Sequence, residues 1–175
     1  MFGSLTELFD IVNLRDEVVG RDVRAKVHDL GLLHRAVHIF VRTEVGHWVL
    51  QKRSSCKDID PHKWTTSCSG HLDSGEDYLE AAIRECKEEL NLQIGPEQLI
   101  ELLRISPCTE TGNEFVRVYT LKQLVKPKMN KMEIAELKAL DLKTIDCLVN
   151  SNPEKCSLSF LHIFPMVVSK LKTLT

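Results

Sequence analysis

Apolar and polar residues alternate in many short segments of this chain, as they do in strands that bury one face. Turn-forming residues separate these segments, and several of the segments are rich in β-branched and aromatic residues. The strands that the pattern predicts are residues 8–12, 18–23, 36–43, 47–53, 63–70, 99–106, 115–121 and 134–140. The first two are expected to pair as a short hairpin.

Helical spacing of apolar residues marks other segments between and after these strands. Residues 24–31 predict a short helix, and residues 142–150 predict a helix that is capped by Asp141. Residues 157–172 carry a longer apolar pattern, in which Pro165 is expected to kink or divide the helix. Strands interleaved with helices favour an α/β fold with a mixed sheet that is covered on both faces.

A further helix is predicted inside residues 70–92, GHLDSGEDYLEAAIRECKEELNL, after a loop that contains two glycines. When the helix is taken from Glu76, its apolar residues recur at steps of four, three and four. The residues of this stripe, which we expect to face a core, are Leu79, Ile83, Cys86 and Leu90. The acidic residues fall on another side of the helix.

These acidic residues form a carboxylate cluster. Glu85, Glu88 and Glu89 stand at positions i, i+3 and i+4, so they project from successive turns and repel one another. A hard cation is the natural compensator, because Mg²⁺ takes oxygen ligands and is commonly held by carboxylates together with substrate phosphates. The alternative is an ordinary solvated acidic face, softened by Lys87. The preceding glycines favour the metal site, since they allow a sharply turning loop.

Residues 70–92 resemble the Nudix box, G-x5-E-x7-R-E-U-x-E-E-x-G-U, in which U is an aliphatic residue. The six fixed positions that match are Gly70, Glu76, Arg84, Glu85, Glu88 and Glu89. Two positions depart from the motif, because Cys86 replaces an aliphatic residue and Asn91 replaces the last glycine. A buried thiol behaves as a small hydrophobe, and asparagine tolerates the left-handed conformation that closes a helix. The catalytic positions of the motif are therefore intact.

The resemblance implies a Nudix-type α/β/α sandwich with a mixed β-sheet. It implies a single domain over residues 1–175, with an N-terminal hairpin and short helix in residues 1–34 and the box in residues 70–92. It also implies a metal-dependent hydrolase that cleaves a diphosphate bond by attack of water.

In enzymes of this family the box supplies the metal site. The ligands implied for Mg²⁺ or Mn²⁺ are Glu85, Glu88, Glu89 and the carbonyl oxygen of Gly70. Glu76 and Arg84 are implied to orient the loop and the helix. A carboxylate takes the proton of the attacking water, and Glu85 is the first choice for this base. Some family members draw the base from outside the box, so Glu133 and Glu136 are the alternatives.

A second resemblance extends over about residues 8–140 and concerns the Nudix branch that includes type I isopentenyl-diphosphate isomerase. That enzyme uses a catalytic cysteine beside a glycine-histidine pair. In this chain Ser69 directly precedes Gly70 and His71, and the thiol of Cys68 lies one residue earlier. Because neighbouring side chains of a strand point to opposite faces, the shift argues against the isomerase mechanism. The intact R-E-U-x-E-E core also favours hydrolysis.

Three histidines form a further candidate site. His28, His34 and His71 are candidates for a metal cluster of the isomerase type, together with Glu133 or Glu136. The alternative is that such histidines bond to the backbone or contact a substrate phosphate. The sequence leaves both interpretations open.

Composition restricts the kinds of partner. The formal net charge of −2 gives no basic footprint for a nucleic-acid backbone, so a large DNA or RNA substrate is disfavoured. No apolar run approaches the ~20 residues of a membrane span, and no secretory signal is visible. The six cysteines contain no CxxC element and favour a reduced, cytoplasmic setting. A monomer and a homodimer are both compatible with the sequence.

We therefore expect a hydrolase that acts on a nucleoside diphosphate derivative or a similar small pyrophosphate compound. The substrate itself is not readable, because specificity in this fold comes from loops outside the box. An isomerase of the isopentenyl-diphosphate type is one alternative. Another is a nucleotide-binding sensor without turnover, although a pure binder need not keep mutually repelling carboxylates.

Overall fold

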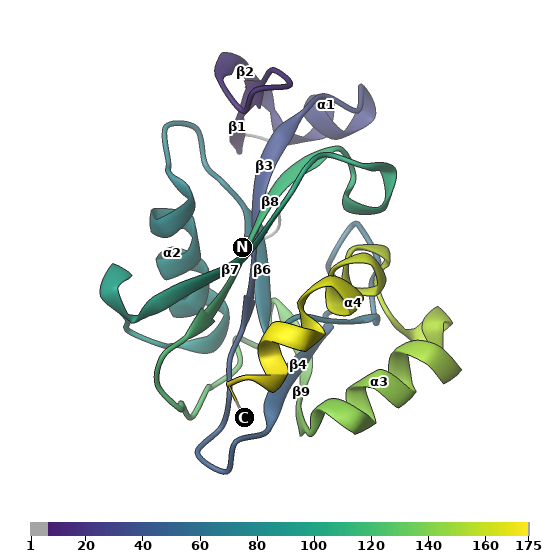
Figure 1. Ribbon diagram of the computed structural model, residues 1–175. Helices are drawn as coiled ribbons and strands as arrows, with labels where there is room; N and C mark the ends of the chain where they lie inside the picture. Colours follow the sequence, from purple (N-terminus) through teal and green to yellow (C-terminus); the bar gives the residue numbers. More distant parts are fainter. Residues whose placement is uncertain (1–6, 175) are drawn as a thin grey trace.

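Two small β-sheets lie at the centre of the molecule, with helices on either side (Figure 1). The computed structural model describes residues 7–174. Its strands are β1 (Leu8–Val12), β2 (Val18–Val23), β3 (His34–Phe40), β4 (Trp48–Arg53), β5 (Trp64–Thr65), β6 (Cys68–His71), β7 (Leu99–Ile105), β8 (Glu114–Leu121) and β9 (Ile134–Leu140). Its helices are α1 (Arg24–Asp29), α2 (Tyr78–Leu90), α3 (Leu142–Ser151) and α4 (Leu158–Lys172), with 3-10 turns η1 (Pro96–Gln98), η2 (Thr109–Thr111) and η3 (Pro153–Lys155). Within residues 7–174, none of the helices has the length and apolar character that crossing a membrane requires.

The sheets combine parallel and antiparallel pairs. The four-stranded sheet has the order β6-β3-β8-β7, in which β3 and β8 are parallel and the two outer pairs are antiparallel. The three-stranded sheet has the order β5-β4-β9 and is antiparallel. Strands β1 and β2 form the expected hairpin, which lies beside α1 at one end of the molecule (Figure 1). Mixed pairing between two layers of helices confirms the expected α/β/α sandwich.

Each side of the sheets has its own hydrophobic core. Helix α2 covers one side, and α3 and α4 cover the other (Figure 1). The core under α2 includes Val37, Ile39, Ala82, Cys86 and Leu90. The core under α3 and α4 includes Phe40, Trp48, Ile145, Phe160 and Phe164. Full burial of a large apolar side chain stabilises a fold by roughly 1.5–3 kcal/mol, so the helices are firmly held against the sheets.

The predicted strands all form with small shifts of their ends, except that residues 63–70 do not make one strand. Strand β5 pairs with β4, whereas β6 pairs with β3 in the other sheet. Ser67 lies between β5 and β6 and is buried. Its hydroxyl accepts a hydrogen bond from the Val41 N–H at 2.8 Å and donates one to the Val49 carbonyl. The Ser67 hydroxyl therefore satisfies two backbone groups where the chain crosses from one sheet to the other. The alternation of apolar and polar residues does not predict such a crossing.

Pro165 does not divide the last helix, contrary to one of the two expected outcomes. Helix α4 is continuous across it. Pro165 is exposed, while Ile163, Phe164 and Val167 on the other side of the helix are buried. Packing of this apolar face on the sheet outweighs the backbone hydrogen bond that a proline removes.

Helix α2 begins two residues later than expected. Asp77 is its N-cap and accepts hydrogen bonds from the N–H groups of Leu79 and Glu80 at 2.8 and 2.9 Å. The Glu80 carboxylate accepts the Asp77 N–H in return, which completes a capping box. The expectation that Leu79 faces the core is wrong, because Leu79 is 39% exposed and the small residues Ala81 and Ala82 are buried instead. Small residues at this contact let the helix approach the sheet closely.

The C-terminal end of α2 matches the expectation and provides a first test. Asn91 adopts φ 53° and ψ 37°, the left-handed conformation, and its N–H donates to the Lys87 carbonyl at 3.1 Å. Glycine adopts this conformation without the steric cost of a Cβ, so Asn91→Gly is expected to raise the free energy of unfolding by about 0.5–1 kcal/mol. Asn91→Ala should lower it by about 1 kcal/mol. Urea denaturation measures both changes, and a destabilised Asn91→Gly protein would contradict the reasoning.

Candidate functional site

Arg84 fixes the loop before α2 against the helix. Its Nε and Nη2 both donate to the Glu76 carboxylate at 2.9 Å. Nη2 also donates to the His71 carbonyl at 2.8 Å, and Nη1 donates to Glu85 at 2.7 Å. A planar guanidinium suits such a fork of contacts, which a lysine would not reproduce. The loop and the helix are thereby held together, which is the geometry that a supporting role for Glu76 and Arg84 requires.

Glu85 and Glu89 point into the protein, whereas Glu88 points toward its surface. Glu85 is 8% exposed and Glu89 is 2% exposed, but the side chain of Glu88 is 57% exposed. Glu89 accepts a hydrogen bond from the Gln51 amide at 2.8 Å and one from the Ser69 N–H at 3.3 Å. The three acids of the motif therefore do not form one solvated patch.

Gly70 lies directly against Glu85. A Cβ added at Gly70 would lie 1.8 Å from Oε1 of Glu85 and 2.2 Å from its Cδ. Any side chain at this position would push the carboxylate away. The backbone of β6 and the carboxylate of α2 meet here only because residue 70 is a glycine.

The protein compensates the two buried carboxylates in part, through the Arg84 contact with Glu85 and the ammonium of Lys57 near Glu89. Burial, followed by the charge of Glu89, raises the pKa of Glu85 to about 8. Burial also raises the pKa of Glu89, against the opposing effect of Lys57, whose ammonium lies 3.4 Å from the carboxylate. Because the pKa values of both buried carboxylates stay raised despite Arg84 and Lys57, the pair fits a divalent cation, which takes oxygen ligands. Glu85 and Glu89, with Glu88 at the rim, are the residues placed to hold one.

Without a divalent cation, the contribution of Glu85 to stability should fall as the pH rises. The carboxyl has a pKa near 4.5 in the unfolded chain and about 8 in the folded protein, so the folded state binds more protons between these values. The contribution is complete below about pH 4.5 and is lost as the pH rises through about 8. Urea denaturation with a chelator present measures this loss. Glu85→Gln should reduce it, and an unchanged pH dependence in that variant would contradict the prediction.

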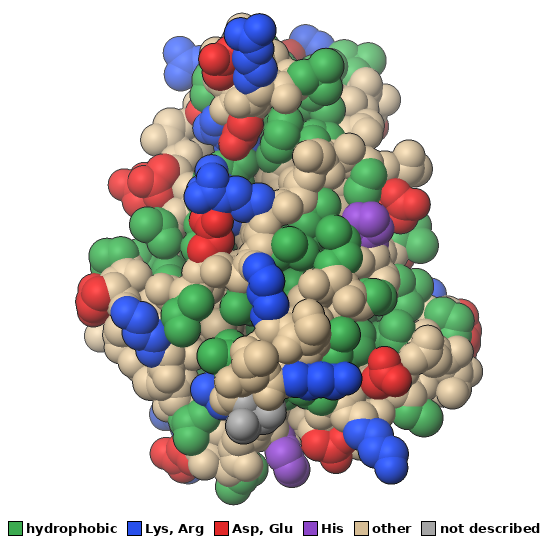
Figure 2. Space-filling view, viewed as in Figure 1, with side chains coloured by type: hydrophobic (Ala, Val, Ile, Leu, Met, Phe, Trp, Pro, Cys, Tyr) green, Lys and Arg blue, Asp and Glu red, His purple; other side chains and the backbone are tan. Residues whose placement is uncertain are grey.

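A cleft of about 920 Å³ adjoins these carboxylates. Its lining includes Gly70, Glu85, Glu88 and Glu89, together with the basic residues Arg24, Arg53 and Lys57. This volume is typical of a site that binds a small molecule. The basic residues lie beside the carboxylates that could hold a cation, and such a combination suits an anionic substrate. On the face shown in Figure 2, by contrast, acidic and basic side chains are intermixed without a continuous basic stripe.

Of the two acids outside the box, Glu133 lines the cleft and Glu136 does not. The Glu133 carboxylate lies 2.5 Å from the ammonium of Lys57. Burial raises the pKa of Glu133, the hydrogen bond and charge of Lys57 lower it, and the net shift is downward. Glu136 is exposed on β9, opposite Lys52. The geometry of the cleft favours Glu133 over Glu136 as a second acid near a substrate.

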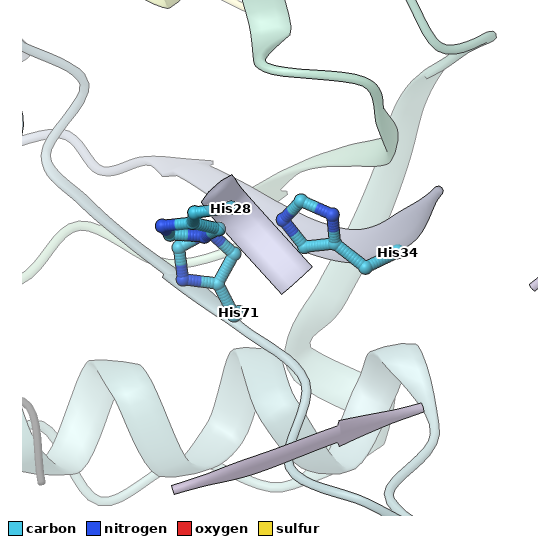
Figure 3. Close-up of side chains that lie close together, drawn as sticks. All are labelled: His28, His34 and His71. Atoms are coloured by element: carbon cyan, nitrogen blue, oxygen red, sulfur yellow. The ribbon is translucent and has the colours of Figure 1, made fainter. Parts of the chain in front are cut away.

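Three histidines come together beside the cleft, as Figure 3 shows. Ring nitrogens of His28, His34 and His71 lie within 4.8 Å of one another. The carboxylate that faces them belongs to Glu114 of β8. The expectation that Glu133 or Glu136 joins this cluster is therefore wrong. Its Oε1 lies 2.8 Å from Nε2 of His71 and 3.6 Å from Nε2 of His34. Sequence reasoning missed Glu114 because only the pairing of β8 with β3 brings it to the histidines.

His34 presents an open ring nitrogen to the group. Its Nδ1 donates to the Leu32 carbonyl at 2.8 Å, and its Nε2 is buried and has no hydrogen-bond partner within residues 7–174. Burial lowers the pKa of His71 to about 3 despite the opposing effect of Glu114, so that ring is neutral. Nε2 of His71 lies 2.8 Å from Glu114, and its Nδ1 lies 3.3 Å from Nη1 of Arg24. An imidazole that donates one N–H to a carbonyl, as His34 does, is a common metal ligand.

Cys68 points away from the cleft. It is fully buried, and its sulfur lies 3.8 Å from that of Cys86 in α2. Burial, together with the Cys86 contact, raises the pKa of the Cys68 thiol well above its ordinary value, which disfavours the reactive thiolate. The next residue, Ser69, is the one that lines the cleft. Cys68 is therefore not placed to react with a ligand in the cleft.

The chain is similar in sequence and in fold to known proteins. Residues 32–155 match the family model described as the NUDIX domain. The chain is 36% identical over 135 residues to a Nudix hydrolase of Deinococcus radiodurans, which covers 77% of this chain and 79% of that protein. It is 30% identical over 161 residues to an isopentenyl-diphosphate Delta-isomerase of Serratia proteamaculans, covering 91% and 90%. The crystal structure of DR0079 from Deinococcus radiodurans matches with a TM-score of 0.79 and 29% identity, over 92% of this chain and 99% of that one.

Proposed function

Because the chain belongs to the Nudix family of pyrophosphohydrolases, we propose that it hydrolyses a diphosphate bond in a nucleoside diphosphate derivative or a similar small pyrophosphate compound. The observation that carries the proposal is the pair of buried carboxylates, Glu85 and Glu89, at the cleft beside Gly70. Such a pair suits a divalent cation, and the basic residues of the same cleft suit the phosphates that accompany it.

The residues of the box fit the divalent cation that the family generally uses. Glu85, Glu88 and Glu89 would hold Mg²⁺ or Mn²⁺, with the carbonyl oxygen of Gly70 as a further ligand. Bound there, the cation would neutralise charge on the diphosphate and make a bound water more acidic. An all-oxygen set favours a hard ion over a soft one.

Other side chains of the cleft have separate roles in this proposal. Arg84 keeps Glu85 in position through its 2.7 Å contact. Arg53 and Lys57 line the cleft and would contact phosphate oxygens. The proton of the attacking water passes to a carboxylate, for which Glu85 is the first choice and Glu133 the second, since both line the cleft.

The histidine cluster supports a second cation in the same proposal. His28, His34, His71 and Glu114 offer imidazole and carboxylate ligands, which suit an ion such as Mn²⁺ or Zn²⁺. The isomerase branch that the chain resembles also holds a metal with histidines and glutamates. We expect the wild-type protein to bind one more equivalent of Mn²⁺ than His34→Ala, as measured by electron paramagnetic resonance. Equal stoichiometry in the two proteins would remove the second cation from the proposal.

The isomerase alternative rests on the isomerase-named relatives and on the histidine cluster, and the sensor alternative rests on the box alone. The buried position of Cys68 argues against an isomerase, because its thiol does not face the cleft. The buried acids argue against a sensor, because a binder without turnover gains nothing from two desolvated, mutually repelling carboxylates.

A panel of substrates separates these three functions. The panel contains nucleoside diphosphates and triphosphates, nucleotide sugars and non-nucleotide diphosphates, each with Mg²⁺. We expect release of orthophosphate or a mononucleotide from at least one compound, and loss of that activity in Glu89→Gln. Interconversion of isopentenyl and dimethylallyl diphosphates that is lost in Cys68→Ala would instead establish the isomerase. Tight nucleotide binding with no product would establish the sensor.

A further inference from the structure

A second group of metal-ligating side chains lies where η2 meets α4. Cys108 precedes η2, Glu110 belongs to η2, and His162 belongs to α4. One ligand atom from each of the three lies within 4.8 Å of the others. Helix α4 brings His162 to this place from a distant part of the chain. The group is separate from the carboxylates of the box and from the three histidines.

The distance between the sulfur and nitrogen atoms of the group matches a tetrahedral metal site. With a Zn–S bond of about 2.3 Å and a Zn–N bond of about 2.05 Å, tetrahedral geometry separates the sulfur and nitrogen ligands by about 3.6 Å. Sγ of Cys108 lies 3.6 Å from Nε2 of His162. A hydrogen bond between thiol and imidazole would explain this one distance, but it does not explain why the Glu110 carboxylate lies within reach of both.

The carboxylate of the group is accessible to a cation from solvent. Cys108 and His162 are half-buried, and Glu110 is exposed. Thr109 and Glu110 both line the cleft, so the open side of the group faces the cleft and solvent.

We propose that Cys108, Glu110 and His162 bind a zinc-class divalent cation, with the fourth position open to water. A thiolate and an imidazole select a borderline soft ion, whereas the all-oxygen box selects a hard one. On binding, the thiol proton passes to solvent and the sulfur becomes a ligand of the ion. The protein would thus carry a thiolate-containing cation site along the same cleft as the all-oxygen site of the box.

Such an ion would add a bond between η2 and α4, which already pack against each other. Helix α4 is anchored by Ile163 and Phe164, which are buried in the core. In η2 the buried Thr111 hydroxyl contacts the backbone of Cys108. A cation that binds the folded state stabilises it by mass action and would strengthen the contact of this wall of the cleft with α4.

Cobalt spectroscopy on the full chain tests the site. Co²⁺ occupies zinc sites, and a thiolate ligand gives it a near-ultraviolet charge-transfer band that carboxylate or histidine ligands do not give. Titration of the metal-free protein with Co²⁺ alone should produce this band. Cys108→Ser should abolish the band, and His162→Gln and Glu110→Gln should each weaken Co²⁺ binding at this site by about 100-fold. Cys147→Ser is the matched control, because Cys147 is an exposed thiol whose sulfur contacts Ser151 instead of a metal-ligating group.

The same titration can overturn the proposal. A wild-type protein without the band, or a Cys108→Ser protein that keeps it, would show that no cation binds this thiol. Wild-type affinity in Glu110→Gln or His162→Gln would show that the three side chains do not act as one site. Glu110 is exposed, so Glu110→Gln is expected to fold normally. A change in Co²⁺ affinity in this variant can therefore be assigned to the lost ligand and not to misfolding.

Discussion

Replacing Glu85 with glutamine is expected to lower kcat/KM by about 10³-fold, or about 4 kcal/mol of transition-state stabilisation. The same change should leave the Tm of the metal-free protein at pH 7 unchanged or higher. Burial raises the pKa of this carboxyl to about 8, so the metal-free protein holds it largely protonated, and an amide of the same shape replaces it without a new buried charge. Steady-state kinetics with Mg²⁺ and thermal unfolding with a chelator measure the two effects.

Glu80→Gln is the matched control for this prediction. Glu80 lies on the same helix, and its side chain accepts the Asp77 N–H at 2.9 Å. Glutamine also serves at this position of a capping box, so both kcat/KM and Tm should stay near the wild-type values. If Glu85→Gln were as active as Glu80→Gln, Glu85 would be neither a metal ligand nor the base.

Gly70→Ala is expected to lower kcat/KM by at least about 10²-fold and the free energy of unfolding by about 1–3 kcal/mol. The new Cβ would lie 1.8 Å from Oε1 of Glu85, which is closer than two non-bonded atoms can approach. The carboxylate must then leave its position beside β6, and its contact with Arg84 is disturbed. Kinetics with Mg²⁺ and urea denaturation of the same preparation measure the two losses.

Gly20→Ala serves as the control for this change. A Cβ at Gly20 would meet Cδ1 of Ile11 at 3.9 Å, an ordinary van der Waals contact, so the variant should be as stable and as active as the wild type. A Gly70→Ala protein with full activity would show that the close approach to Glu85 has no part in the reaction.

Local patterns were sufficient to predict most of the architecture. The β-branched and aromatic residues of β3 and β4, the apolar face of α3 and the cap at Asp141 each depend on residues close in the chain, although β3 and β4 are buried on both faces instead of one. Asn91 is the clearest case, because its tolerance of the left-handed conformation predicted how α2 ends despite the missing glycine. The position of the carboxylates on α2 followed in the same way from helical spacing.

Contacts between distant segments were not predictable in this way. Glu114 meets the histidines because β8 pairs with β3, and Lys57 meets both Glu89 and Glu133 from a loop. The burial of the acidic side chains was not predictable either, because helical spacing puts Glu85, Glu88 and Glu89 on the same side of α2. Only the packing of α2 on β6 buries two of them and leaves the third exposed. These features depend on tertiary contacts, which the periodicity of apolar residues along the chain does not predict.

Isothermal titration calorimetry with Mg²⁺ tests the central claim most directly, because the hard ion favours the oxygen ligands of the box over histidine and thiol. The account predicts that the wild-type protein binds Mg²⁺ and that the double variant Glu85→Gln, Glu89→Gln binds it at least about 100-fold more weakly. A wild-type protein that binds no Mg²⁺, or a folded double variant that binds it equally well, would contradict the account.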